Sequence, residues 1–109
     1  MLNNTDKIRQ LNDSFRRTFI GGDVMLTLGI RMKSEKEVVD ILERVRTFKD
    51  FTPANNPYSE DDSASFDHNG EKIIWKIDYY DKNYRFLSDN PADPTITNRV
   101  LTIMTAEEY

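Results

Sequence analysis

Two segments in the first half of the chain place apolar residues at spacings of three and four, the repeat of an amphipathic helix. The first begins behind Thr5 as N-cap and ends at Gly21-Gly22, and the second begins with a capping box from Ser34 to Glu37. Their apolar stripes are Ile8, Leu11, Phe15 and Phe19, then Val38, Ile41, Leu42, Val45 and Phe48. We therefore expect two helices, each with one buried face.

Strict alternation of apolar and polar residues predicts a strand over residues 23–31, in which Gly29 marks a bulge or a close approach. Asn69-Gly70 predicts a type I′ hairpin turn, because both of its central residues need positive φ. The expected register sets His68 opposite Glu71, Asp67 opposite Lys72, Phe66 opposite Ile73 and Ala64 opposite Trp75. A turn around Asp81 then leads into a third strand over residues 84–87.

Two stretches lack so clear a repeat. Residues 49–63 carry two prolines and the run Glu60-Asp61-Asp62, which predicts a long loop that Phe51 and Tyr58 pin to the body, with the acidic run free. Further on, Asp93 can cap a helix whose first position is Pro94 and whose ending, Ala106-Glu107-Glu108, favours a helix. A strand through residues 100–103 is the alternative that β-propensity favours, and we prefer the helix.

These elements predict a single domain over residues 1–109, in the order α-β-α-β-β-β-α. Its class is α+β, with an antiparallel three- to four-stranded sheet and two or three helices packed on one face. The other face of the sheet stays partly exposed and carries Ile74, Lys76, Asp78 and Tyr80, an uneven mixture that suits an interaction surface.

The composition removes several kinds of chemistry. The chain has no cysteine, which removes thiol catalysis and cysteine-bound zinc. Its one histidine, His68, leaves little for histidine-based triads or histidine-rich metal sites. We interpret His68 as a turn residue that pairs with Glu71, and we predict no cofactor and no metal site. Since no signal-peptide pattern or membrane-length apolar run is present, we expect a cytoplasmic protein without membrane contact.

The net charge of −4 is unevenly distributed. Residues 1–49 carry 10 basic and 7 acidic groups, whereas residues 50–93 carry 4 basic and 10 acidic groups. An acidic surface disfavours direct binding of nucleic acid but attracts a basic nucleic-acid-binding protein. The candidate partner-binding residues are Glu60, Asp61, Asp62, Asp67, Asp78, Tyr80 and Asp81.

The leading hypothesis is a non-enzymatic protein-binding domain, and no residue is assigned a catalytic role. The alternative is a small carboxylate-based hydrolase or nucleotide-handling enzyme, which requires Asp50, Asp78 and Asp81 to converge in one pocket. A homodimer that covers the open sheet face is a third possibility.

Five stretches of the chain carry a resemblance to known proteins: Leu11 to Phe19, Phe48 to Thr52, Trp75 to Asp81, Arg99 to Met104, and Glu107 to Tyr109. They resemble a family of short bacterial proteins described as a domain of unknown function, DUF3768. The resemblance implies no catalytic residues. Such genes resemble the accessory cargo of plasmids and other mobile elements, which suggests an inhibitor of a nucleic-acid-processing complex, of the anti-CRISPR or antirestriction type.

Overall fold

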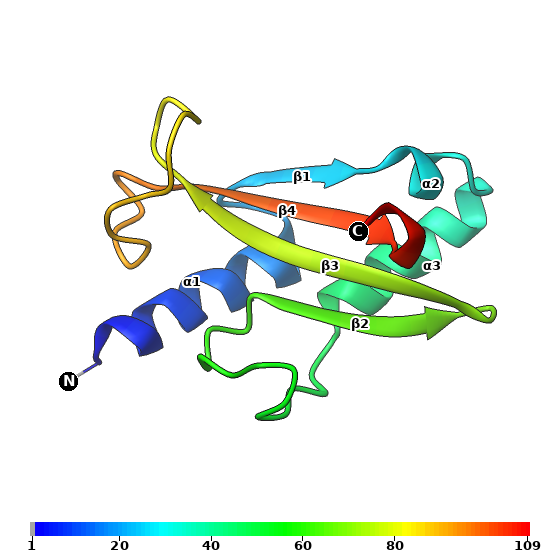
Figure 1. The fold of residues 1–109 in the computed structure, drawn as a ribbon, viewed down its shortest axis with the longest axis horizontal. Coiled ribbons are helices and arrows are strands. Elements are labelled where there is room, and N and C mark those ends of the chain that lie inside the picture. Colours follow the sequence, from blue (N-terminus) through cyan, green and yellow to red (C-terminus); the bar gives the residue numbers. More distant parts are fainter. Residues whose placement is uncertain (1) are drawn as a thin grey trace.

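Figure 1 shows the fold of residues 2–109, the part of the chain that the computed structural model describes. Two amphipathic helices come before the hairpin, and the strand at the centre of the sheet comes near the end of the chain. The elements in chain order are α1 (Asn4–Thr18), β1 (Asp23–Leu26), α2 (Leu28–Arg31), α3 (Glu35–Arg46), β2 (Ser63–His68), β3 (Glu71–Tyr80), β4 (Asn98–Thr105) and the 3₁₀ turn η1 (Ala106–Glu108).

Side-chain caps fix the starts of both long helices. Asn3 Oδ1 accepts from the amide of Asp6 at 2.8 Å, so Asn3 caps α1 and the prediction of Thr5 as N-cap is wrong. Ser34 caps α3 through the amide of Glu37, as predicted. Helix α1 ends at Phe19, whose left-handed backbone (φ 59°) lets its amide bond to the carbonyl of Phe15.

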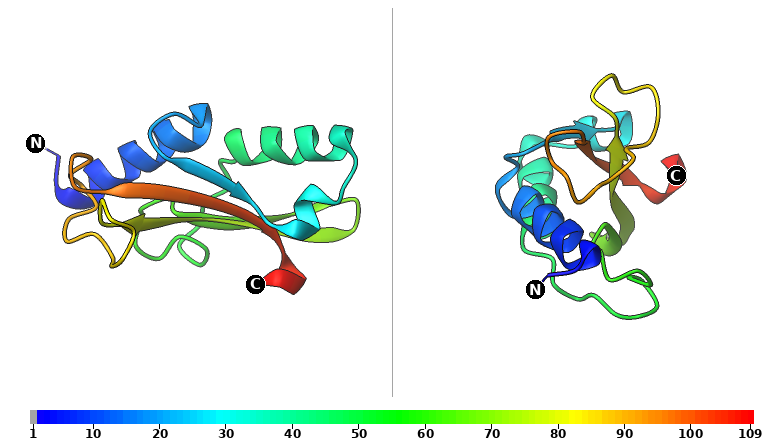
Figure 2. Two further views of the ribbon diagram at one scale, coloured as in Figure 1. Left: turned by 90° about the horizontal axis from the view of Figure 1, so that it is seen from above. Right: turned by 90° about the vertical axis from the view of Figure 1, so that its left-hand side faces the viewer.

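Within residues 2–109 four strands form one sheet in the order β1-β4-β3-β2. β1 runs parallel to β4, while the other neighbours are antiparallel. The α+β class is confirmed, but the sheet is mixed and the prediction of a purely antiparallel sheet is wrong. Helices α1 and α3 cover one face, and η1 lies on the other side of the sheet (Figure 2).

The hairpin forms in the predicted register, with Asp67 opposite Lys72 and Phe66 opposite Ile73. Asn69 and Gly70 both have positive φ, 51° and 83°, as a type I′ turn requires. This register buries Phe66 and Ile73 under the helices together with Ala64, Trp75 and Ile77.

The predicted strand over residues 23–31 is wrong after Leu26. Leu28 is exposed although it continues the alternation, because Thr27 starts the short helix α2 and turns the chain away from the sheet. Gly29 marks a close approach, as anticipated: a Cβ there would lie 2.6 Å from a carboxylate oxygen of Glu108.

The predicted helix that begins at Pro94 is also wrong, because residues 98–105 form β4. Its apolar residues are buried on both faces of the sheet, Leu101 and Ile103 under the helices and Val100 and Met104 on the other side. β4 occupies the place beside β3 that a third meander strand would need. Residues 84–87 therefore keep only an isolated bridge between Leu87 and Tyr80.

The core centres on Trp75, whose ring meets those of Phe48 and Phe51 edge to face at 5.8 and 6.0 Å. Phe51 thus pins the long loop to the body as predicted. Tyr58 does not, because its side chain is exposed.

Candidate functional site

The acidic run of the long loop is held against α1 and β3. Asn12 Nδ2 donates to the carbonyl of Glu60 at 2.9 Å, and the Tyr79 hydroxyl donates to Glu60 Oε1 at 2.8 Å. Asp61 is only 9% exposed. The prediction of a free acidic run is wrong, because α1 and β3 supply the donors that bind this segment.

Asp61 and Asp13 form a pair of neighbouring carboxyl groups. Burial and a hydrogen bond with the Asp13 carboxyl together raise the pKa of Asp61 to about 6, while Asn56 opposes the change. Asn56 Nδ2 donates to Asp61 Oδ1 at 2.7 Å, and Arg16 Nη2 donates to Asp13 Oδ1 at 3.1 Å. The pair ties the loop to α1 when one proton is shared.

A buried polar network extends from this loop to β4. Asn12 Nδ2 donates to the Tyr79 hydroxyl at 2.8 Å, and Asn12 Oδ1 accepts from Arg99 Nε at 2.8 Å. The Arg99 guanidinium also lies 5.2 Å from the centre of the Tyr79 ring. Burial raises the pKa of Tyr79 and lowers that of Arg99. Both side chains position the acidic run of the long loop. Tyr79 does so by donating to Glu60, and Arg99 does so through Asn12, which donates to the carbonyl of Glu60.

Asp62, Asp78 and Tyr80 lie on the uncovered side of the sheet. Asp62 and Asp78 line one shallow hollow there. Burial raises the pKa of Asp62, and the charge of Asp78 adds to the effect. Lys76 Nζ pairs with Asp78 Oδ2 at 3.0 Å, and the Tyr80 ring lies 6.4 Å from that of Tyr84.

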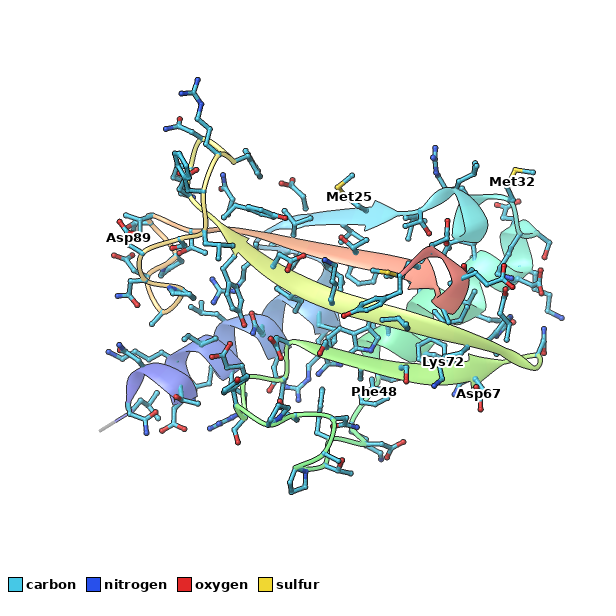
Figure 3. The ribbon with its side chains drawn as sticks, in the orientation of Figure 1. Met25, Met32, Phe48, Asp67, Lys72 and Asp89 are labelled. Atoms are coloured by element: carbon cyan, nitrogen blue, oxygen red, sulfur yellow. The ribbon has the colours of Figure 1, made fainter. Side chains whose placement is uncertain are left out.

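The remaining two predicted residues lie elsewhere. Asp67 is exposed near the hairpin end of β2, far from Asp89 at the opposite end of the molecule (Figure 3). Asp81 Oδ1 accepts from the amides of Asn83 and Arg85, each at 3.0 Å, which makes it a turn-forming residue. The seven predicted residues do not form one acidic patch.

The three carboxylates that the enzyme hypothesis needs do not share a cavity among those found in residues 2–109. Asp50 lines a hollow beside the end of α3, and Asp78 lines the hollow on the open face. Asp81 is held in its own turn. This arrangement gives no support to acid–base catalysis by these residues.

His68 stands opposite Glu71 in the hairpin, but the predicted pairing of their side chains is wrong. The His68 ring is buried, with Nε2 3.7 Å from Glu37 Oε1, and Glu71 instead pairs with Lys33. Successive residues of a strand point to opposite faces, which directs His68 toward α3.

Sequence reasoning missed the most exposed apolar segment, residues 81–88, which we call the apolar loop. Tyr84, Phe86 and Leu87 are 53%, 74% and 73% exposed. The loop follows β3 and projects beyond the edge of the sheet (Figure 1). Because the sequence pattern predicts a strand over residues 84–87, it does not indicate that their apolar side chains are exposed.

The apolar loop is ordered by hydrogen bonds at its base and tip. The amide of Asp81 donates to the carbonyl of Phe86 at 2.8 Å, and the amide of Ser88 donates to that of Tyr79 at 3.0 Å. The Tyr84 hydroxyl donates to Asp23 Oδ2 at 2.6 Å. Tyr84 has φ 58°, the left-handed region that bulky residues rarely adopt. The loop thus holds a strained conformation while exposing its apolar side chains.

Two general properties bear on function. Within residues 2–109 no cluster of three or more His, Asp and Glu side chains is placed to bind a metal ion. No helix of the described chain combines the length and apolar character needed to cross a membrane.

Comparison with known proteins gives one family. The sequence model of the family described as "Protein of unknown function (DUF3768)" matches residues 26–108, which include β3, β4 and the apolar loop. No curated protein and no solved structure matches the chain.

Proposed function

This chain belongs to the DUF3768 family, and we propose that it is a non-enzymatic protein-binding domain whose contact surface includes the apolar loop. The observation that carries this proposal is an ordered loop that presents Tyr84, Phe86 and Leu87 to solvent. Burying a Phe or Leu side chain contributes about 1.5–3 kcal/mol, so leaving both exposed forgoes that stabilisation within the monomer.

Order in the free loop favours binding. Ordering a flexible loop opposes association, and a loop already held by Asp81, Ser88 and Asp23 avoids most of that cost. A backbone strained at Tyr84 is also typical of functional segments. Tyrosine and phenylalanine are suited to this role because aromatic side chains dominate the centres of protein interfaces.

The narrower proposal concerns the kind of partner. Residues 50–93 have six more acidic than basic groups, which supports a basic nucleic-acid-binding protein as the partner. Asp62 and Asp78 line the hollow on the open face together with Lys72 and Lys76, so the acidic excess of residues 50–93 is carried outside this hollow. Inhibition of a nucleic-acid-processing complex, of the anti-CRISPR or antirestriction type, is the activity we propose for such a contact.

The test is a pull-down from a lysate of the organism that carries the gene, followed by reconstitution with the purified partner. The double variant Phe86→Ser and Leu87→Ser removes the exposed apolar side chains and should weaken partner binding at least tenfold. Val39→Ser is the matched control, because Val39 is 58% exposed on α3, away from the loop.

Equal binding by the double variant and the wild type would contradict the proposed surface. For the narrower proposal, the reconstituted nuclease complex should lose cleavage activity with the wild type and keep it with the double variant. Full cleavage in the presence of bound wild-type protein would overturn inhibition while leaving the protein-binding proposal intact.

A further inference from the structure

A cavity of about 490 Å³ lies between α1, the turn before β1, the base of the apolar loop and the start of β4. Its apolar wall comes from Leu11, Phe15, Ile20 and Pro94. Its polar wall comes from Ser14, Asp23, Lys82, Asn98 and Arg99. From this lining we infer that the cavity binds a small anion, a carboxylate or phosphate group carried on an apolar body.

Arg99 is the first reason. It is 3% exposed, and within residues 2–109 it forms no ion pair. Arg99 Nε donates to Asn12 and Nη2 donates to the carbonyl of Pro91, both neutral acceptors. Over the same residues Nη1 has no hydrogen-bond partner. A buried guanidinium without a carboxylate partner is costly, and an anion in the adjoining cavity would offset that cost.

Lys82 is the second reason. Its Nζ lies 3.2 Å from Asn98 Oδ1 and 3.4 Å from the carbonyl of Thr97, and it makes no ion pair within the described chain. The two nearby carboxylates already have donors. Asp23 accepts from the Tyr84 hydroxyl, and Asp93 accepts from the amide and hydroxyl of Thr95. Two cations therefore border one cavity in a protein whose net charge is −4.

The turn at the cavity wall requires glycine at position 22, because a side chain there would clash with its neighbours. A Cβ on Gly22 would lie 2.6 Å from the carbonyl oxygen of Arg99 and 2.7 Å from the Phe15 ring. Gly21 has φ 106°, which side-chain-bearing residues rarely adopt. The Gly21-Gly22 turn is thus fitted against Arg99, and it fixes the distance between α1 and β4 at the cavity.

The apolar wall narrows the class of ligand. Leu11, Phe15 and Pro94 cannot hydrogen-bond an inorganic ion, but they can pack against a ring or short alkyl chain. We therefore expect benzoate to bind more tightly than acetate, and phenyl phosphate more tightly than inorganic phosphate. Each pair shares its anionic group, so the difference measures the apolar wall alone.

The experiment is an NMR titration of the ¹⁵N-labelled protein with benzoate, phenyl phosphate, acetate and inorganic phosphate at constant ionic strength. Saturable shifts at the amides of Gly21, Gly22 and Asn98 with benzoate or phenyl phosphate support the site. Lys82→Met should weaken that binding at least fivefold. Lys76→Met, which removes a lysine from the open sheet face, should leave it unchanged.

Shifts that grow linearly without saturation for all four anions would overturn the inference, as would equal binding by Lys82→Met and the wild type. Benzylamine keeps the ring and reverses the charge, so its binding with equal strength would also overturn it. Lys82 and Tyr84 of the apolar loop line the cavity, but Phe86 and Leu87, which the double variant changes, do not. Because the titration contains no partner protein, its failure is distinguishable from failure of the protein-binding proposal.

Discussion

Asp61 holds its carboxyl group in an environment that disfavours charge. It is buried beside Asp13, it has a left-handed backbone (φ 53°), and it receives a hydrogen bond from Asn56. Asparagine tolerates the left-handed region at least as well as aspartate and carries no charge. The position therefore suits Asn or a protonated Asp, and ionised Asp less well.

Asp61→Asn should raise the stability of the protein at pH 8 and have little effect near pH 4. The folded-state pKa of Asp61, about 6, lies above its ordinary value of 3.8. The folded state therefore binds the proton more tightly, and wild-type stability falls as the pH rises from about 4 through about 6. Urea unfolding of both proteins at pH 4 and pH 8 measures the difference.

Asp89→Asn is the control for a general effect of charge, because Asp89 is exposed in the segment between β3 and β4. Its stability difference from the wild type should not follow the pattern of Asp61→Asn. A gain from Asp61→Asn that is equal at pH 4 and pH 8 would show that the raised pKa does not act on folding.

Elements whose structure is decided by local chemistry were predictable from the sequence. The hairpin between β2 and β3 is one, because Asn69-Gly70 sets the turn and the turn sets the register. β4 is the opposite case. Ile96, Val100, Ile103 and Met104 fit a helical repeat, and only pairing with β1 and β3 makes the segment a strand. That pairing joins residues far apart in the chain, so no local pattern reveals it.

The candidate site was predictable to a smaller extent. Asp78 and Tyr80 lie on the open face, as the alternation in β3 implied, and Asp62 of the long loop, which the alternation does not cover, joins them there. Phe86 and Leu87 are exposed because β4 occupies the place beside β3. The local sequence pattern does not predict β4, so it does not predict this exposure either. The buried state of Asp61 depends on α1, whose Asn12 donates to the neighbouring carbonyl of Glu60 and whose Asp13 carboxyl lies beside Asp61. Sequence spacing does not bring these residues together.

The Glu108 carboxylate joins two elements from distant parts of the chain, η1 and α2. Glu108 Oε1 accepts from the Thr27 hydroxyl at 2.6 Å and from the amide of Thr105 at 2.9 Å, and Oε2 accepts from the amide of Gly29 at 2.8 Å. These hydrogen bonds lower the pKa of Glu108 to about 2. The ionised carboxylate therefore holds the end of the sheet together.

Glu108→Gln should lower the melting temperature at pH 7, because an amide presents one acceptor oxygen where the carboxylate presents two. The folded-state pKa lies below the ordinary value of 4.5, so the carboxylate stabilises the fold above about pH 4.5 and loses this effect as the pH falls toward 2. The difference between variant and wild type should shrink over that range. Melting curves at pH 7, 4 and 2.5 test this.

Glu107→Gln is the matched control for Glu108→Gln, because Glu107 is the exposed neighbour in the same turn. Its melting temperature should stay close to that of the wild type. A loss of stability in Glu108→Gln that is constant from pH 7 to pH 2.5 would contradict the role given to the ionised carboxylate.

At the scale of the whole molecule, the side chain of Arg16 connects the layers. Its Nη1 donates from α1 to the carbonyls of Val45, Arg46 and Phe48 at the end of α3. Its guanidinium also lies 5.3 Å from the centre of the Trp75 ring in the sheet. The orphan carbonyls of one helix are thus satisfied by a cation from the other, against the aromatic core of the sheet.

Arg16→Met should destabilise the protein by about 3 kcal/mol, because it removes the side-chain donor shared by three carbonyls at the end of α3. Arg16→Lys should recover little of this loss, since a lysine ammonium cannot reproduce the planar fork that spans several acceptors. Urea unfolding at pH 7 gives the free energies. Arg17→Met, an exposed change at the next position of α1, should stay within about 0.5 kcal/mol of the wild type.

The comparison of Arg16→Met with Arg16→Lys separates the hydrogen bonds from the charge. If the positive charge over Trp75 and beside Asp13 were the main contribution, lysine would restore most of the stability. If the hydrogen bonds to α3 matter most, both variants lose similar stability, and exchange of the amides at the end of α3 accelerates in both. The second outcome is expected, because Arg16 Nη1 donates to three carbonyls, those of Val45, Arg46 and Phe48, of which the Val45 carbonyl also accepts from the amide of Phe48 at 3.3 Å. Stability close to that of the wild type in Arg16→Lys would refute it.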